Sequence, residues 1–387
     1  MFINLKDKLC FIIVWEILTL SFEGSVSGLY ITGRTHTVSN EFNIMVAGGS
    51  FVNATSFSEL SDVELVNPFW DTSVCEKPKN MPSNVDGTVS GIVGNKPIIC
   101  GGLQSQSNEL YGIKQTVTNI CHTMNGNEWK VSSNSLRCPR WRASSVMLNE
   151  GHMWVIGGNT DSSSSDKCLD TATSSEILKS NSTEFEMSVI LPEPMVYHCM
   201  VKIDENTIFI INGYDPYHEG ISRAYVVDIS TEPFTFVALP SLKKGRSNAA
   251  CGIITYENEL TIVVAGGGFG PTSRTTEIYK LSNIYEPHKH WESGPLLPRG
   301  FSNGCLINSE LNDLVMIGGF DEHGKVQPDL IYYNSNSEQF ETLPSKLRTP
   351  RYGCTAIKML DSGDCMEKMV LQKYLQVYQH IPYYTRH

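Results

Sequence analysis

The sequence has few basic residues for its length. Its 387 residues include 30 Lys and Arg against 41 Asp and Glu, which gives a formal net charge of -11. No basic run reverses this balance locally. Nucleic acids and anionic membrane surfaces attract clustered positive charge, so the composition excludes both as general partners.

Long apolar runs are also missing. A membrane-spanning helix needs about 18 consecutive apolar residues, and the apolar N-terminal stretch is interrupted by Glu16. We therefore expect no membrane insertion. Lys6 and Lys8, the apolar "LCFIIVW" and the small residues of "GSVSG" instead predict a signal peptide over 1–28, followed by a lead-in over 29–42. Glu16 is atypical of a signal, and a helix or strand lying on the domain is the alternative.

Clustered metal ligands and catalytic motifs are scarce. His288 and His290 are the only close histidine pair, and His198 is expected to line the channel or the core. The segment Gly300–Gly304, "GFSNG", matches a nucleophile motif in letters only, because no strand-turn-helix pattern surrounds it. We therefore predict no catalytic residue, no metal and no cofactor.

Cysteines, in contrast, are plentiful, with 11 in the chain. Removing Cys10 with the predicted signal leaves ten, an even number that fits disulfides in an oxidising compartment. The sequons at Asn53 and Asn181 fit the same compartment and predict glycosylation. These features favour a secreted protein, with a cytoplasmic location as the alternative.

Glycine pairs after short apolar runs recur through the chain, as in "LVMIGGF" from Leu314. The pairs start at residues 48, 101, 157, 212 and 266, then 318, so successive units are 53, 56, 55, 54 and 52 residues apart. A period this regular indicates one structural unit per repeat. The repeat glycines are Gly48, Gly49, Gly101, Gly102, Gly157, Gly158, Gly213, Gly266, Gly267, Gly318 and Gly319.

A second marker, a proline followed by arginine with the variants Pro194-Met195 and Gly245-Arg246, keeps the same period. From residue 140 to 195, 246, 299 and 351 the steps are 55, 51, 53 and 52 residues. An acidic or aromatic strand and a later aromatic residue, such as Trp129 or Trp291, lie between the two markers. The marker residues are Arg140, Met195, Arg246, Arg299 and Arg351.

With these residues the chain resembles the kelch family from about Asn43 to Lys358, and within it the secreted invertebrate kelch-repeat proteins that lack a BTB domain. The resemblance implies an all-β fold, a six-bladed propeller of four-stranded blades over 43–359. The chain begins in mid-unit and ends in mid-unit, so the C-terminal strand near Met359 should close the ring beside the strand at Asn43. The tail, 360–387, could be a short helix.

Four cysteines, at positions 199, 251, 305 and 354, fall nearly in register on the predicted innermost strands. Because neighbouring blades seldom bring Cα atoms within ~7 Å, we expect these four to pack as small apolar residues. The expected disulfide partners are therefore the irregular set. They are Cys75, Cys100, Cys121, Cys138, Cys168 and Cys365.

The family resemblance implies a binding protein, a monomer that recognises a protein or glycan partner through the loops of one propeller face. Loops carry binding residues on a rigid frame, and arginine and aromatic residues supply most hot spots. A galactose-oxidase-like or other enzyme with a site in the central channel is the first alternative, and an intracellular kelch adaptor is the second. The candidate binding residues are Arg142, Tyr197, Tyr214, Asp215, Phe320 and Asp321.

Overall fold

The computed structural model describes residues 42–52, 57–68, 77–108, 112–160, 168, 170–211, 213, 222–268, 270–284, 286, 289–308 and 314–359. The chain divides into two compact units, Met1–Glu41 and Phe42–His387, and the described residues all belong to the second. The predicted signal peptide, the lead-in up to Glu41 and the tail lie outside the described residues, so those assignments stay predictions.

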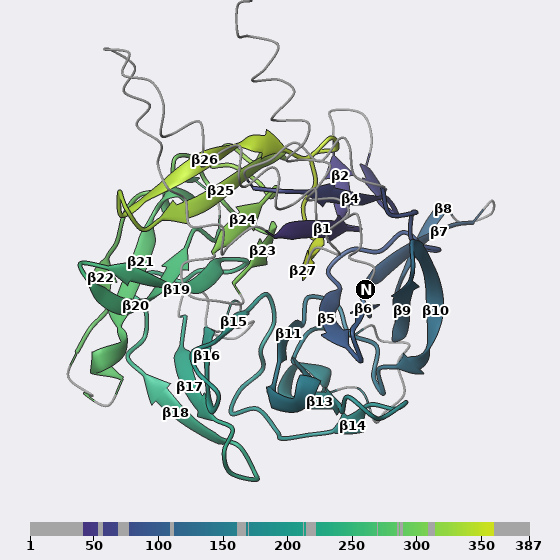
Figure 1. Ribbon diagram of the computed structural model, residues 1–387, viewed down its shortest axis with the longest axis horizontal. Coiled ribbons are helices and arrows are strands. Elements are labelled where there is room, and N and C mark those ends of the chain that lie inside the picture. The colour runs from purple at the N-terminus through teal and green to yellow at the C-terminus, as the bar shows by residue number, and fades with distance from the viewer. Residues whose placement is uncertain are drawn as a thin grey trace, which may run out of the picture. The chain divides into compact units, whose positions relative to one another are not determined.

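Six antiparallel sheets, here called blades I to VI, are arranged around a common centre (Figure 1). This confirms the predicted all-β, six-bladed propeller with four-stranded blades, of which blade I shows three strands among the described residues. Blade I contains β27 (Thr355–Met359), β1 (Asn43–Ala47) and β4 (Val63–Val66). Blade II contains β5 (Val89–Val93), β6 (Lys96–Cys100), β9 (Ile120–Asn125) and β10 (Glu128–Ser135).

The other four blades each follow the chain order from the centre outward. Blade III contains β11 (Ser144–Met147), β12 (Met153–Ile156), β13 (Ser175–Leu178) and β14 (Glu186–Met187). Blade IV contains β15 (Cys199–Lys202), β16 (Thr207–Ile211), β17 (Ala224–Asp228) and β18 (Thr235–Leu239). Blade V contains β19 (Ala250–Tyr256), β20 (Glu259–Ala265), β21 (Thr276–Lys280) and β22 (Glu292–Ser293). Blade VI contains β23 (Cys305–Ile307), β24 (Val315–Ile317), β25 (Asp329–Asn334) and β26 (Gln339–Lys346).

Smaller elements lie in the connections. Two hairpins follow the first two glycine pairs: β2 (Ser50–Val52) with β3 (Phe57–Glu59), and β7 (Leu103–Asn108) with β8 (Gly112–Val117). Short 3-10 turns are η2 (Asn149–Gly151), η4 (Thr171–Thr173), η5 (Gly270–Arg274) and η6 (Leu281–Asn283). None of the helices found in the described ranges is long and apolar enough to span a bilayer.

The two ends of the propeller chain meet in blade I, as predicted. β27 pairs antiparallel with β1 from Asn43 opposite Met359 to Ala47 opposite Thr355. β1 also pairs with β4 on its other side. Closure of this kind removes the open sheet edges that would otherwise pair with other chains.

The hydrophobic core lies between neighbouring blades and forms six clusters, one for each pair of neighbours. Phe209 of blade IV, for example, packs with Trp291 of blade V, and both are at most 1 % exposed. The repeated aromatic residues Trp129, Phe185 and Phe340 are likewise at most 5 % exposed. Each blade is therefore stabilised by apolar surface that only its neighbour can cover.

The glycine pairs permit a close approach between blades. A Cβ on Gly157 would lie 2.1 Å from the carbonyl oxygen of Met195, and one on Gly318 would lie 2.4 Å from that of Arg351. Both glycines also have positive φ, 59° and 65°. Only glycine meets both conditions without strain, so these pairs have a structural role.

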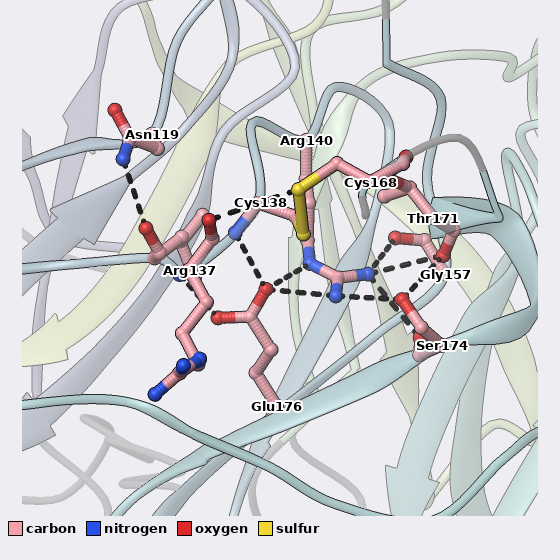
Figure 2. Close-up of a disulfide and its surroundings, with 10 residues drawn as sticks. Asn119, Arg137, Cys138, Arg140, Gly157, Cys168, Thr171, Ser174 and Glu176 are labelled. Carbon is pink, nitrogen blue, oxygen red and sulfur yellow. Dashed lines mark hydrogen bonds and ion pairs between the residues drawn. A yellow bond between two sulfur atoms is a disulfide. The ribbon is translucent and has the colours of Figure 1, made fainter. Parts of the chain in front are cut away.

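Three of the marker arginines, Arg140, Arg246 and Arg351, are buried within their blades and bind the same groups each time. The Arg140 guanidinium donates to the Gly157 carbonyl at 2.8 Å and to Glu176 on β13 at 2.8 and 3.0 Å (Figure 2). Glu176 also accepts the backbone N–H groups of Arg137 and Cys138. The cation is therefore paired and hydrogen-bonded, as a charge buried in a core must be.

Blades V and I repeat this arrangement. Arg246 donates to the Gly266 carbonyl at 2.6 Å and pairs with Glu277 at 3.1 Å. Arg351 donates to the Gly48 carbonyl at 3.0 Å and pairs with Glu64 at 2.5 Å. The Pro-Arg and glycine markers keep one period because they contact each other directly in the fold, and in blade I this contact joins the two chain ends.

Four disulfides are present among the described residues, and they correct part of the sequence prediction. Cys100–Cys121 and Cys138–Cys168 come from the expected set. Cys199–Cys251 and Cys305–Cys354, expected to stay unpaired, are also bonded, with Cα atoms 5.9 and 5.3 Å apart. The expectation was wrong because the innermost strands of neighbouring blades converge at the centre, within normal bridging distance. Cys75 and Cys365 lie outside the described residues.

Candidate functional site

Six residues, one at the start of each blade's innermost strand, form a closed ring of backbone hydrogen bonds. Each N–H donates to the carbonyl of the preceding ring residue, at distances of 2.7 to 3.2 Å. Because all six innermost strands begin here, the ring surrounds one end of the central channel. We call it the mouth ring. Its members are Gly87, Arg142, Tyr197, Asn248, Asn303 and Gly353.

Every residue of the mouth ring has the left-handed backbone conformation, with φ between 56° and 66°. Two of the six are glycine, for which this conformation carries no strain. Arg142 and Tyr197 carry large side chains in the same conformation, at φ 59° and 56°, which costs about 1–2 kcal/mol per residue. Strain of this kind is concentrated at functional sites in proteins.

The Arg142 side chain crosses the mouth. From blade III it donates to Asn303, on the opposite side of the ring, and it forms an ion pair with Asp86 at 2.6 Å. Its guanidinium carbon also lies 5.2 Å from the ring centre of Trp141 and 5.8 Å from that of Tyr197. The arginine is thus held by charge, hydrogen bonds and two aromatic faces, and it covers the entrance to the channel.

Asp86 connects the mouth to the first hairpin. Its carboxylate accepts from Arg142, from the Trp141 indole at 3.1 Å and from the Ser50 hydroxyl at 2.7 Å. Burial raises the pKa of Glu59, the strand partner of Ser50, despite its hydrogen bonds with Ser105. Burial and the nearby Asp86 also raise the pKa of Tyr352. The carboxylate of Asp86 thus contributes to the raised pKa of both Glu59 and Tyr352.

Below the mouth, the innermost strands enclose a cavity of about 360 Å³. Its wall includes the hydroxyls of Ser90, Ser145 and Thr355, which hydrogen-bond the inner edges of blades I, II and III to one another. On the other side of the channel, Asn308 of blade VI donates to the carbonyls of Met200 and Cys251 in blades IV and V. Polar side chains thus connect the inner edges of neighbouring and more distant blades.

Of the predicted binding residues, the structure brings Arg142 and Tyr197 together in the mouth ring. Phe320 is not a ring residue: it pairs with Ser302, the residue before Asn303, and stacks on Tyr352 with ring centres 4.4 Å apart. Asp321 is buried, and its carboxylate accepts from His323, Lys325 and Gln327 within its own loop. Its geometry is that of a loop-forming residue. Tyr214 and Asp215 lie outside the described residues.

The sequence prediction missed Asp86, Trp141 and Asn303. A signal for the ring does exist, because Arg142, Tyr197, Asn248 and Gly353 each lie two positions after a marker residue. Asn303 lies four positions after Arg299, so an insertion hides its equivalence. Asp86 and Trp141 precede ring residues and carry no repeated pattern of their own.

His198 follows Tyr197 but is buried between blades III and IV, with its ring against Gly157. Neither ring nitrogen has a hydrogen-bond partner among the described residues, and burial lowers the pKa of His198 to about 3. It is a neutral core residue at pH 7. Within the described part of the chain, no group of three or more His, Cys, Asp or Glu side chains is arranged to hold a metal ion.

Comparisons with known proteins support the fold and go no further. No protein-family profile and no curated protein matches the sequence. A solved structure titled "Structure of YjhT" is similar with a TM-score of 0.54 and 14% identity, over 79% of this chain and 98% of that chain. Likeness at this identity shows a shared propeller fold alone. Kelch membership itself stays a prediction.

Proposed function

We propose that this protein is a secreted binding protein that recognises a protein or glycan partner through the mouth face of its propeller. The mouth face is defined here as the mouth ring with Asp86, Trp141, Phe320 and Tyr352. The rigid ring supplies the frame, and the side chains of Arg142, which is 9% exposed, and Tyr197, which is half-buried, supply the contacts.

The observation that carries this proposal is the strain in the mouth ring. Glycine would satisfy the backbone conformation at all six positions, and two positions have it. Arg142 and Tyr197 keep side chains there at a cost in stability. A role for those side chains outside folding explains why they are present.

Secretion is supported by the four disulfides, because such bonds persist in oxidising compartments. Asn181 is exposed in the turn between β13 and β14, where a glycosylating enzyme can reach it. A glycosidase-sensitive mass shift that disappears in Asn181→Gln would support this part of the proposal. Its absence from protein made through a secretory pathway would count against glycosylation.

An enzyme with its site in the channel is the alternative prediction. Substrate entry through the mouth would require Arg142 to leave Asp86 and Asn303. A binding role needs no such movement, so we favour it.

The mouth face is tested by comparing Tyr197→Gly with Glu150→Gly. Glu150 has the same left-handed conformation, φ 59°, but lies in the turn between β11 and β12 at the opposite end of blade III. Wild-type and variant proteins would be applied to an array of glycans and to a panel of extracellular proteins. We expect Tyr197→Gly to lose the wild-type ligands and Glu150→Gly to keep them. Equal binding by both variants would place the site elsewhere.

A further inference from the structure

We propose that the ligand of the mouth face is a neutral, hydroxyl-rich sugar, bound through the carboxamides of Asn248 and Asn303. This inference rests on the proposed function and names the chemical class of its ligand. It follows from the charge, the unfilled hydrogen-bonding groups, the backbone and the apolar surface at the mouth.

The charge at the mouth favours a neutral ligand. Among the described residues, the mouth ring contains one cation, Arg142, and Asp86 neutralises it at 2.6 Å. The whole chain is acidic, with a net charge of -11. An anionic ligand would have to compete with Asp86 for the guanidinium in a negative surrounding field, so a neutral ligand is favoured.

The side chains of Asn248 and Asn303 have hydrogen-bonding capacity that the described residues leave unused. The side-chain amide of Asn248 forms no hydrogen bond with any described residue, and Asn303 uses only its oxygen, which accepts from Arg142. Both asparagines are half-buried and adjacent in the ring. A carboxamide presents a donor and an acceptor side by side. Two neighbouring hydroxyls of a sugar ring, each both donor and acceptor, match that pattern.

The backbone of the mouth ring cannot bind a peptide strand. An extended peptide binds by adding its backbone to an exposed sheet edge. At the mouth, all six ring N–H groups and all six carbonyls are used in bonds with one another. The mouth ring therefore offers no free backbone to a peptide, and recognition depends on side chains.

The described residues of the mouth face expose little apolar surface. Protein interfaces have a desolvated centre of large apolar residues. Among the described residues, the exposed large hydrophobics all lie away from the mouth ring and its chain neighbours. The aromatic rings at the mouth are stacked on one another or on Arg142. This surface suits a small polar ligand better than a protein partner.

The test uses a glycan array divided into neutral, sialylated, sulfated and uronic-acid glycans, probed with wild-type protein, Asn248→Gly and Asn95→Gly. Asn95 is the matched control, since it has φ 60° and is exposed in the turn between β5 and β6. We expect binding to neutral glycans only, unchanged between low and high salt. Asn248→Gly should lower the affinity at least tenfold, and Asn95→Gly should leave it unchanged. Inhibition by free hexoses would separate recognition of a single sugar from recognition of a longer chain.

Binding confined to anionic glycans, weakening with salt, would overturn the inference. So would the absence of glycan binding together with a protein ligand that Tyr197→Gly abolishes, although that result would support the proposed function. If Tyr197→Gly, Asn248→Gly and wild type bind every ligand alike, the proposed function itself fails.

Discussion

Arg140 and Arg142 are two residues apart, and they belong to different layers of the molecule. Arg140 is buried in blade III, and Arg246 and Arg351 repeat its contacts in blades V and I. Arg142 is in the mouth ring, where the backbone repeats six times but the side chains are Gly, Arg, Tyr, Asn, Asn and Gly. The repeated arginines hold the blades together, whereas the mouth-ring side chains differ from blade to blade, as the proposed recognition role requires.

Blade IV shows what happens when the packing layer departs from the repeat. Met195 replaces the marker arginine, and Tyr225 occupies the place of the glutamate. A different acidic and basic residue, Glu193 and Arg223, form an ion pair in this blade, with the arginine 42% exposed and the glutamate 8% exposed. Tyr225 hydrogen-bonds Glu193, so the blade keeps its four strands with a rearranged polar cluster in place of the buried arginine–glutamate pair.

The largest effect is expected from removing the closing strand. A chain that ends at Ser345 lacks Arg351 and β27, so it exposes the edge of β1 and leaves Glu64 buried without its arginine. We predict loss of the cooperative unfolding transition. A chain that ends at Met359 keeps every described strand and serves as the control. A cooperative melt of the shorter chain, close to that of the control, would show that closure does not depend on β27.

The next largest effect is expected from breaking the buried ion pair between Arg140 and Glu176, compared with the more exposed pair between Arg223 and Glu193. Arg140→Met leaves the fully buried Glu176 unpaired, and we expect the free energy of unfolding to fall by about 3–5 kcal/mol. Arg223→Met removes a pair whose arginine is 42% exposed and whose glutamate is 8% exposed, and we expect a smaller loss of about 1–2 kcal/mol. Urea unfolding measures both. Equal losses would mean that the marker arginines have no special place in the packing layer.

His198 gives an intermediate, pH-dependent effect within the packing layer. Its pKa is lowered to about 3 by burial, so the folded state favours the neutral ring. The stability from this group is complete above pH ~6.5 and declines as the pH falls toward 3. At pH 4.5 the loss should be about 2–3 kcal/mol.

His198→Gln, which does not titrate, isolates this contribution from that of the carboxylates. Between pH 7 and 4.5, the unfolding free energy of wild type should fall by more than that of His198→Gln. A difference that is constant with pH would mean that His198 is solvated or paired.

These comparisons show what the sequence could predict. The six blades were predicted because one physical cause operates in every repeat, and the pairing of β1 with β27 was predicted because the two half-units at the chain ends complete one repeat. Cys199–Cys251 was missed because the convergence of innermost strands depends on the closed ring. Asp86 was missed because its partners, Ser50 and Trp141, come from different blades. A site made of single residues from many blades leaves no local pattern.

The smallest effect on stability is expected in the mouth ring. Asn248→Gly keeps a conformation that glycine adopts freely and removes a side chain with no hydrogen bond to the described residues. We expect the free energy of unfolding to change by less than about 1 kcal/mol, as for Asn95→Gly. A loss above 2 kcal/mol relative to Asn95→Gly would make Asn248 a packing residue.

The most direct test of the two-layer account measures binding and stability together for Tyr197→Gly and Arg140→Met. In Tyr197→Gly, relief of strain offsets the loss of the edge-to-face contact with Trp141, so the unfolding free energy should stay within about 1 kcal/mol of wild type. The account predicts that Tyr197→Gly loses at least tenfold in affinity for the array ligands. Arg140→Met, though far less stable, should bind as wild type at a temperature where it remains folded. The account is contradicted if affinity instead follows stability, with Tyr197→Gly binding normally and Arg140→Met failing to bind.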